Sequence, residues 1–98
     1  MIVIAVSYKA KPGKRDEALK AARTCAATTR REAGNIDYSF YAGIDDPDSF
    51  FLFEQWDNQA ALDTHLKSQH LAAFRAALAD LTARPSVIRM FEASEIKK

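Results

Sequence analysis

The sequence predicts one α+β domain in which strands and helices follow the order βαββαβ. Apolar residues alternate with period two in three stretches, and a fourth stretch is rich in strand-forming aromatics. In the regions between them apolar residues recur at helical spacing, and turn residues separate the segments. The chain of 98 residues can bury one modest core but has no room for a second. We therefore expect a single domain over residues 1–98, with a four-stranded antiparallel sheet and helices on one face.

The first strand and the first helix are predicted from the N-terminal third. Residues 2–11 alternate with one fully apolar side, and a proline–glycine turn follows. Asp16 and Glu17 then favour the start of a helix, because negative charge is stabilised at that end of the helix dipole. Apolar residues at helical spacing extend this helix over about residues 15–33. Gly34 suits the left-handed position that follows a helix end.

The middle of the chain predicts a β-hairpin. Residues 36–44 alternate again, residues 45–48 are turn formers, and residues 50–56 are rich in strand-forming aromatics. A short helix is expected next, because Asp57 or Asn58 can cap it.

The last third completes the pattern with a second helical segment and a fourth strand. The helical segment is expected to break near Ser68, which can cap the part that follows. After Pro85 the alternation returns, with Val87 and Phe91 on one side and Met90 on the other. The resulting order is that of a ferredoxin-like fold. The first and third strands are apolar on both sides, so we expect a second copy of the chain to cover the free sheet face.

The composition excludes several classes of partner. Fourteen Lys and Arg balance thirteen Asp and Glu, for a formal charge of +1, which favours neither nucleic acid nor an anionic membrane. The apolar run at the N-terminus is too short to span a membrane. The lone Cys25 cannot form an internal disulfide, so we expect a cytoplasmic setting. No phosphate-binding, dinucleotide-binding or nucleophile-elbow motif is present in the sequence.

His65 is the leading candidate for chemistry. It lies between Leu62 and Leu66 on the apolar side of its helix and is expected to face the sheet. Partial burial favours a neutral imidazole, which can act as a general base. The alternative is a core histidine that is hydrogen-bonded to a backbone carbonyl or to a tyrosine such as Tyr38.

The other candidates are pocket residues. Trp56, Tyr38 and Phe74 are aromatic side chains that serve equally well in a core or in a site for a flat apolar ligand. His70 is interpreted as a capping or solvent-facing residue, although a break at Ser68 would allow it to approach His65. Because the carboxylates are scattered along the sequence, no metal site is expected.

The sequence resembles the antibiotic biosynthesis monooxygenase domain family, which includes quinol monooxygenase-like members. The segments that carry the resemblance are Lys11-Pro12-Gly13-Lys14, Glu32-Ala33-Gly34-Asn35-Ile36-Asp37-Tyr38, Phe51-Leu52-Phe53-Glu54-Gln55-Trp56, Ala61-Leu62-Asp63-Thr64-His65-Leu66, Ser68-Gln69-His70 and Phe74. They follow the family's order over nearly the whole domain.

The resemblance implies a dimeric α/β barrel, in which two sheets pack together and each subunit keeps a pocket between its sheet and helices. It also implies a monooxygenase that needs no metal or flavin cofactor and acts on small aromatic quinol or polyketide-like phenolic substrates. His65 is then the base, and Trp56, Tyr38, Phe74 and His70 line the substrate pocket.

The sequence departs from the haem-degrading members of this family. His65, Arg75 and Val6 stand where those proteins have a tryptophan, a haem-ligating histidine and an asparagine, so haem degradation is not expected. Two alternatives to the oxygenase stay open: a dimeric small-molecule-binding or stress-response protein without turnover, and an isomerase on the same scaffold.

Overall fold

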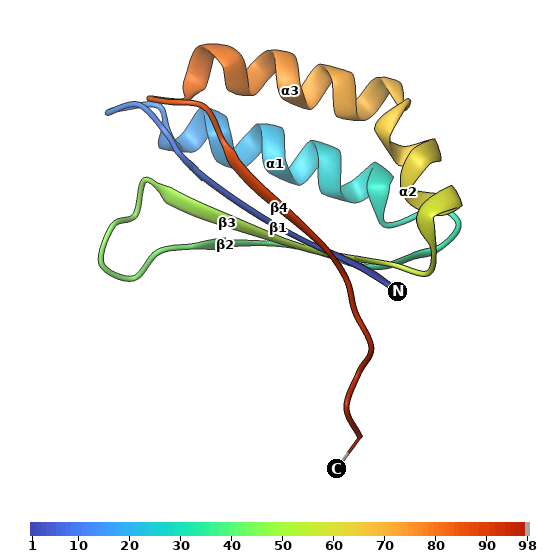
Figure 1. The fold of residues 1–98 in the computed structure, drawn as a ribbon. Helices are drawn as coiled ribbons and strands as arrows, with labels where there is room; N and C mark the ends of the chain where they lie inside the picture. The colour runs from blue at the N-terminus through green and yellow to red at the C-terminus, as the bar shows by residue number, and fades with distance from the viewer. Residues whose placement is uncertain (98) are drawn as a thin grey trace.

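The computed structural model describes residues 1–97 and has the predicted α+β architecture. The seven elements are β1 (Ile2–Lys9), α1 (Arg15–Thr29), β2 (Asn35–Ala42), β3 (Ser49–Trp56), α2 (Gln59–Leu66), α3 (Gln69–Leu81) and β4 (Val87–Glu92). The strands form one antiparallel sheet in the order β2-β3-β1-β4. Figure 1 shows α1 and α3 side by side over this sheet, with α2 at one end. The ferredoxin-like prediction is confirmed.

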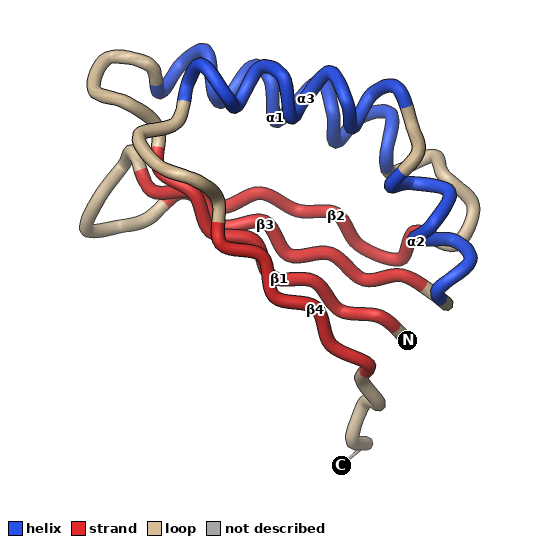
Figure 2. Tube along the Cα trace, turned by 45° about the horizontal axis from the view of Figure 1, so that its top comes forward, coloured by secondary structure: helices blue, strands red, loops and turns tan. Residues whose placement is uncertain are grey.

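The core lies between the helices and one face of the sheet. Because side chains alternate along a strand, the even-numbered residues of β1 and β3 point towards the helices. Ile4, Leu52 and Trp56 are buried there, at 2%, 3% and 0% exposure. Figure 2 shows all three helices on this side of the sheet and none on the other.

The first helix is shorter than the sequence predicts, since it ends at Thr29 rather than near residue 33. The backbone N–H of Glu32 donates to Thr29 O, and that of Asn35 donates to Glu32 O, so the chain turns instead of continuing the helix. Gly34 completes this turn with a φ of +84°. As a result Glu32 lies in a turn, which directs its side chain towards α2.

Both predicted helix caps in the second helical region are present. Asn58 Oδ1 accepts a hydrogen bond from Ala61 N at 2.9 Å, which makes Asn58 the cap of α2. Ser68 Oγ accepts from Leu71 N and caps α3. The break between the two helices therefore falls at the predicted residue. No helix in residues 1–97 is long and apolar enough to cross a membrane.

Gly34→Ala is expected to destabilise the fold by about 2–5 kcal/mol. A side chain at positive φ costs roughly 1–2 kcal/mol, and overpacking adds typically 1–3 kcal/mol. The overpacking is local, because a Cβ on Gly34 would lie 2.5 Å from Ala61 Cβ on α2. Gly13→Ala is a matched control, since Gly13 has a φ of +80° and its Cβ would meet nothing within 4 Å. Urea unfolding of the two variants should separate strain from crowding, and equal losses would contradict the crowding at Gly34.

Candidate functional site

A cavity opens between the inner face of the sheet and helices α2 and α3. Its volume is about 80 Å³. Its apolar walls include Ile4, Val6, Leu52, Phe74, Leu78 and Met90. The mouth lies along β4, where Ile88 and Met90 are 50% and 52% exposed because no helix covers this edge. Such an apolar pocket with a few polar groups is the usual form of a small-molecule site.

Glu54 is the acidic group in the wall of the cavity. It lies on β3 between the inward-facing residues Leu52 and Trp56, and only 5% of it is exposed. Trp56 Nε1 donates a hydrogen bond to Glu54 Oε1 at 3.0 Å. Burial raises the pKa of Glu54 to about 7, and the Trp56 N–H and the Arg75 guanidinium oppose this increase. Near neutral pH the carboxyl group is therefore poised between its neutral and charged forms.

His65 is a second proton-transfer group in the same wall. It lies in the last turn of α2 and is 2% exposed. Its Nδ1 lies 2.6 Å from Glu32 Oε2, so its partner is neither a backbone carbonyl nor a tyrosine. Because an ionised carboxylate only accepts, Nδ1 donates this bond, and the lone pair of the neutral ring is on Nε2. Burial lowers the pKa of His65 below its ordinary value, and the Glu32 carboxylate opposes this decrease.

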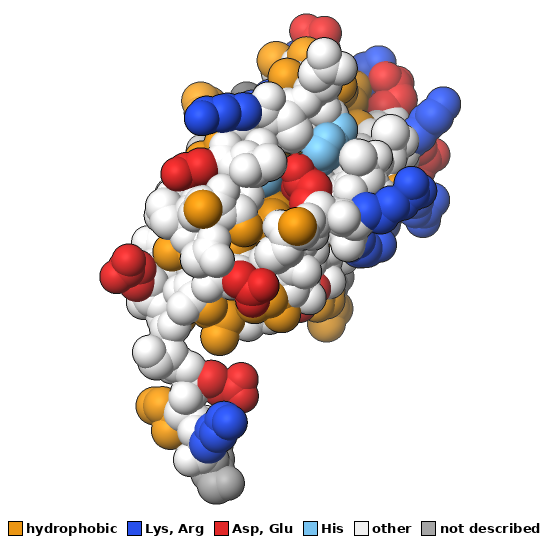
Figure 3. Space-filling view, turned by 90° about the vertical axis from the view of Figure 1, so that its right-hand side faces the viewer, with side chains coloured by type: hydrophobic (Ala, Val, Ile, Leu, Met, Phe, Trp, Pro, Cys, Tyr) orange, Lys and Arg blue, Asp and Glu red, His pale blue; other side chains and the backbone are white. Residues whose placement is uncertain are grey.

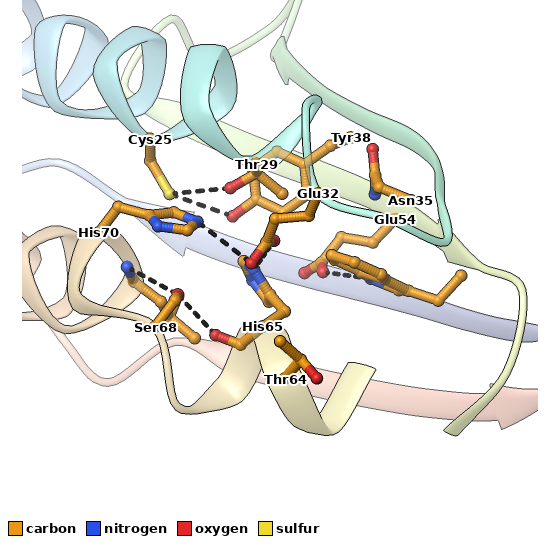
Figure 4. A network of polar contacts seen from close by, with 12 residues as sticks. Cys25, Thr29, Glu32, Asn35, Tyr38, Glu54, Thr64, His65, Ser68 and His70 are labelled. Atoms are coloured by element: carbon orange, nitrogen blue, oxygen red, sulfur yellow. Dashed lines mark hydrogen bonds and ion pairs between the residues drawn. The ribbon is translucent and has the colours of Figure 1, made fainter. Parts of the chain in front are cut away.

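His70 lies on the other side of Glu32, at the start of α3. Its Nε2 is 3.6 Å from Glu32 Oε1, which is too long for a hydrogen bond, and the His65 and His70 ring centroids are 5.7 Å apart. Figure 4 shows Glu32 reaching both rings, while Glu54 lies apart on the sheet side. The side chain of His70 is 21% exposed, so it is half-buried rather than fully solvent-facing. The helix break at Ser68 brings it to His65.

The predicted aromatic residues fall into two groups. Tyr38 and Phe74 line the cavity, with Tyr38 edge-on to His65 at a centroid distance of 5.6 Å. Burial raises the pKa of the Tyr38 hydroxyl, which contacts Cys25 Sγ at 3.5 Å. Trp56 is fully buried behind the cavity wall, where its ring packs on His65 and its N–H binds Glu54. Trp56 and His70 are therefore in contact with the site but are not among the residues that line the cavity in the described chain.

Three further residues belong to the site although the sequence did not single them out. Glu54 and Arg75 line the cavity, and Glu32 binds the candidate base. Glu54 had a detectable signal, because it is a charged residue on the apolar side of a strand. Glu32 and Arg75 had no such sequence signal, because charged residues are common in the segments around them.

Comparison with known proteins assigns this architecture to a family. The family description "Antibiotic biosynthesis monooxygenase" (ABM) matches residues 1–77. The chain belongs to the antibiotic biosynthesis monooxygenase family. It is 32% identical over 95 residues to the Bacillus subtilis protein named "Putative monooxygenase YcnE", covering 97% of this chain and 100% of the relative.

A second relative is an uncharacterised protein of Synechocystis, sll1783, which is 37% identical over 94 residues. The match covers 96% of this chain, which spans only 64% of the length of that relative.

Solved structures of two proteins that are each named "putative antibiotic biosynthesis monooxygenase" are also similar. The structure from Nitrosomonas europaea has a TM-score of 0.90 at 26% identity, covering 95% of this chain and 98% of its own. The structure from Deinococcus radiodurans has a TM-score of 0.93 at 25% identity, covering 100% and 97%. The antibiotic biosynthesis monooxygenase fold predicted from the sequence is therefore shown. In this ABM-family chain, the cavity presents a carboxyl group and an imidazole to any ligand that enters it.

Proposed function

We propose that the chain is a cofactor-independent monooxygenase that acts on small aromatic quinols or polyketide-like phenols. The observation that carries the proposal is the convergence of His65 and Glu54 in one apolar cavity. An apolar wall suits a flat aromatic ring, and two buried proton-transfer groups suit a substrate that must lose a proton before it reacts. The match to the family supports the same reaction class.

In the proposed reaction the substrate supplies all the electrons. His65 Nε2 takes a proton from an activated phenol or from the CH₂ group of an anthrone, and the resulting anion reduces O₂. A carbon–oxygen bond forms, and the hydroperoxide that results loses water to leave a carbonyl group. For an anthrone the balance is CH₂ plus O₂ giving C=O plus H₂O, so no external reductant is required.

The neighbouring groups have separate roles in this proposal. Glu32 holds the Nδ1–H of His65 and thereby keeps the lone pair on Nε2. Neutral Glu54 donates a hydrogen bond to the substrate oxygen on which negative charge develops, as buried carboxylic acids do in other enzymes. Tyr38 and Phe74 supply the apolar contact area for the ring.

The test is oxygen uptake by purified, metal-free protein with a panel of reduced naphthoquinols and anthrones. Heat-inactivated protein is the control, because these compounds also oxidise spontaneously. Uptake above that background, with one oxygen atom from ¹⁸O₂ in the product, supports the proposal. Thermal stabilisation by the same compounds without uptake would instead favour the small-molecule-binding protein. Conversion without oxygen consumption would favour an isomerase.

We also propose that the chain is a homodimer formed through its outer sheet face, which we define as Val3, Ala5, Tyr41, Phe51, Phe53, Val87 and Phe91. Strand register places these residues on the side that no helix covers. Phe51, Phe91 and Val87 are 39%, 45% and 58% exposed. Phe51 and Val87 lie on either side of Ser7 in the sheet, and Phe91 lies beside Val3 on the same face. An exposed apolar patch of this kind normally marks an interface.

Phe91→Glu is expected to convert the dimer into a monomer, because it places a charge in an apolar interface. Light scattering on a size-exclusion column should give twice the 10.9 kDa chain mass for wild type and about the single mass for the variant. Ile44→Glu is the matched control, since Ile44 is 100% exposed in the β2–β3 turn and lies off this face. A wild-type protein that is monomeric at micromolar concentration would contradict the dimer.

A further inference from the structure

Glu32, His65 and His70 gather three metal-binding side chains that are far apart in the sequence. They come from the turn after α1, the end of α2 and the start of α3. One ligand atom of each lies within 4.8 Å of the other two. No metal site is expected from the sequence, because the two histidines have no nearby cysteine and the carboxylates are scattered. Glu32 falls in the expected helix over about residues 15–33, and His65 and His70 would not share a face of a continuous helix. The turn at Glu32 and the break at Ser68 remove both of these separations.

We propose that Glu32, His65 and His70 bind one divalent transition-metal ion, such as Zn²⁺ or Co²⁺, in place of the proton between Glu32 and His65. Two imidazoles and one carboxylate form a ligand set that zinc and non-haem iron sites share. This metal site shares His65 and Glu32 with the catalytic centre proposed above, whose reaction needs no metal.

The distances among the three residues fit such an ion. Ligand atoms about 2.0–2.1 Å from a tetrahedral Zn²⁺ are separated by roughly 3.3 Å. Glu32 approaches the two histidines through different oxygens: Oε2 lies 2.6 Å from His65 Nδ1, and Oε1 lies 3.6 Å from His70 Nε2. With one ligand atom from each residue, all three atoms lie within 4.8 Å of one another. Small side-chain rotations about a common centre would therefore suffice, and the backbone turns need not change.

The Nε2 atom of His70 lacks a hydrogen-bond partner, which supports a bound ion at this position. Its Nε2 is enclosed and has no hydrogen bond within residues 1–97, and it faces Glu32 at a distance that forms only a weak ionic contact. Buried polar atoms in folded proteins normally have partners, so an atom without one requires an explanation. A bound ion would satisfy His70 Nε2 and both of its neighbours at once.

The cluster is held in place and is accessible from one side. Ser68 Oγ donates to His65 O at 2.6 Å and accepts from Leu71 N, which fixes the turn that sets the spacing of the two histidines. The side chains of Glu32 and His70 are 16% and 21% exposed. Figure 3 shows histidine atoms at the surface of this face, next to an acidic side chain. An ion can therefore enter without unfolding of the core.

Metal binding is tested on metal-free protein titrated with ZnCl₂ in a calorimeter and with CoCl₂ in a visible spectrophotometer. We expect one Zn²⁺ per chain and cobalt d–d bands that saturate at the same stoichiometry. His70→Ala and Glu32→Gln should each weaken binding at least about tenfold, as the loss of metal-site residues typically does. Glu17→Gln, an exposed carboxylate on α1, is the matched control and should bind as wild type does. Circular dichroism of each variant establishes that it is folded.

Two results would overturn the metal site. One is the absence of saturable binding of either ion to wild type, and the other is binding that persists unchanged in both His70→Ala and Glu32→Gln. Neither result affects the proposed oxygenase, which is assayed without metal. If the site exists, Zn²⁺ on Nδ1 leaves the hydrogen of His65 on Nε2, so the loaded protein should lose the base and its oxygen uptake.

Discussion

His65→Ala is expected to lower kcat/KM for the best quinol or anthrone by about 10²–10⁴-fold, the usual contribution of a positioned general base. Its partner, Glu32, lies against Nδ1 of the ring, and no other imidazole lines the cavity within residues 1–97. Oxygen uptake by metal-free protein measures the loss. The spontaneous oxidation rate of each compound sets the lower limit of the assay.

Two further variants make this result specific. Thr64→Ala changes the adjacent, exposed residue of α2 and should retain wild-type activity. His65→Gln keeps a polar side chain of similar size against Trp56 and Glu32, so it separates the loss of a base from the loss of packing. If His65→Gln is as active as wild type, the base is another group, and Glu54 becomes the candidate.

The fold was predictable because its signals are local. The period-two alternation of β1 and β2 and the caps at Asn58 and Ser68 depend on neighbours in sequence, and each fixes an element or its end. The sequence predicts an α1 that is too long at its C-terminal end, because residues 30–33 are good helix formers. The chain turns at Glu32 through backbone hydrogen bonds, and Gly34 packs closely against Ala61 of α2. This long-range packing cannot be predicted from a local sequence pattern.

The site was only partly predictable, for a related reason. His65 was found because one apolar helix face predicts burial, and a buried imidazole is unusual. Its partner Glu32 is 33 positions away, and contacts of that kind are set by tertiary packing. His70 was assigned to the solvent because a five-residue spacing separates side chains on a continuous helix. Because the helix breaks at Ser68, this spacing rule does not apply to His65 and His70. The angle between α2 and α3 cannot be predicted from the sequence.

Glu54→Gln is expected to change how stability depends on pH. The carboxyl group has a pKa of about 7 in the folded protein against 4.5 for an ordinary glutamate. Between these values the unfolded chain has lost the proton while the folded protein keeps it, so wild-type stability should fall as pH rises from about 4.5 to 7. The pKa difference corresponds to about 3 kcal/mol, fully expressed above pH 7. Glutamine keeps the acceptor for Trp56 Nε1 and has no charge to desolvate.

Urea unfolding at pH 5 and pH 8 measures this effect directly. Glu54→Gln should be more stable than wild type by only about 1 kcal/mol at pH 5 and by about 3 kcal/mol at pH 8. Other charges near Glu54 are Arg75, which favours ionisation, and Glu32, which disfavours it, and both remain in the variant. Glu17→Gln, at an exposed site, controls for the loss of one charge.

The same substitution separates the role of Glu54 in stability from its role in catalysis. If neutral Glu54 donates to the developing oxyanion, wild-type kcat/KM should decline above an apparent pKa near 7, and the side-chain amide of the Glu54→Gln variant should remove that alkaline decline. A stability difference with an unchanged pH–rate profile would leave Glu54 as a buried acid without a part in the reaction. Parallel stability curves for the two proteins would instead show that Glu54 ionises normally, and the proposed hydrogen bond to the substrate would then lack its donor.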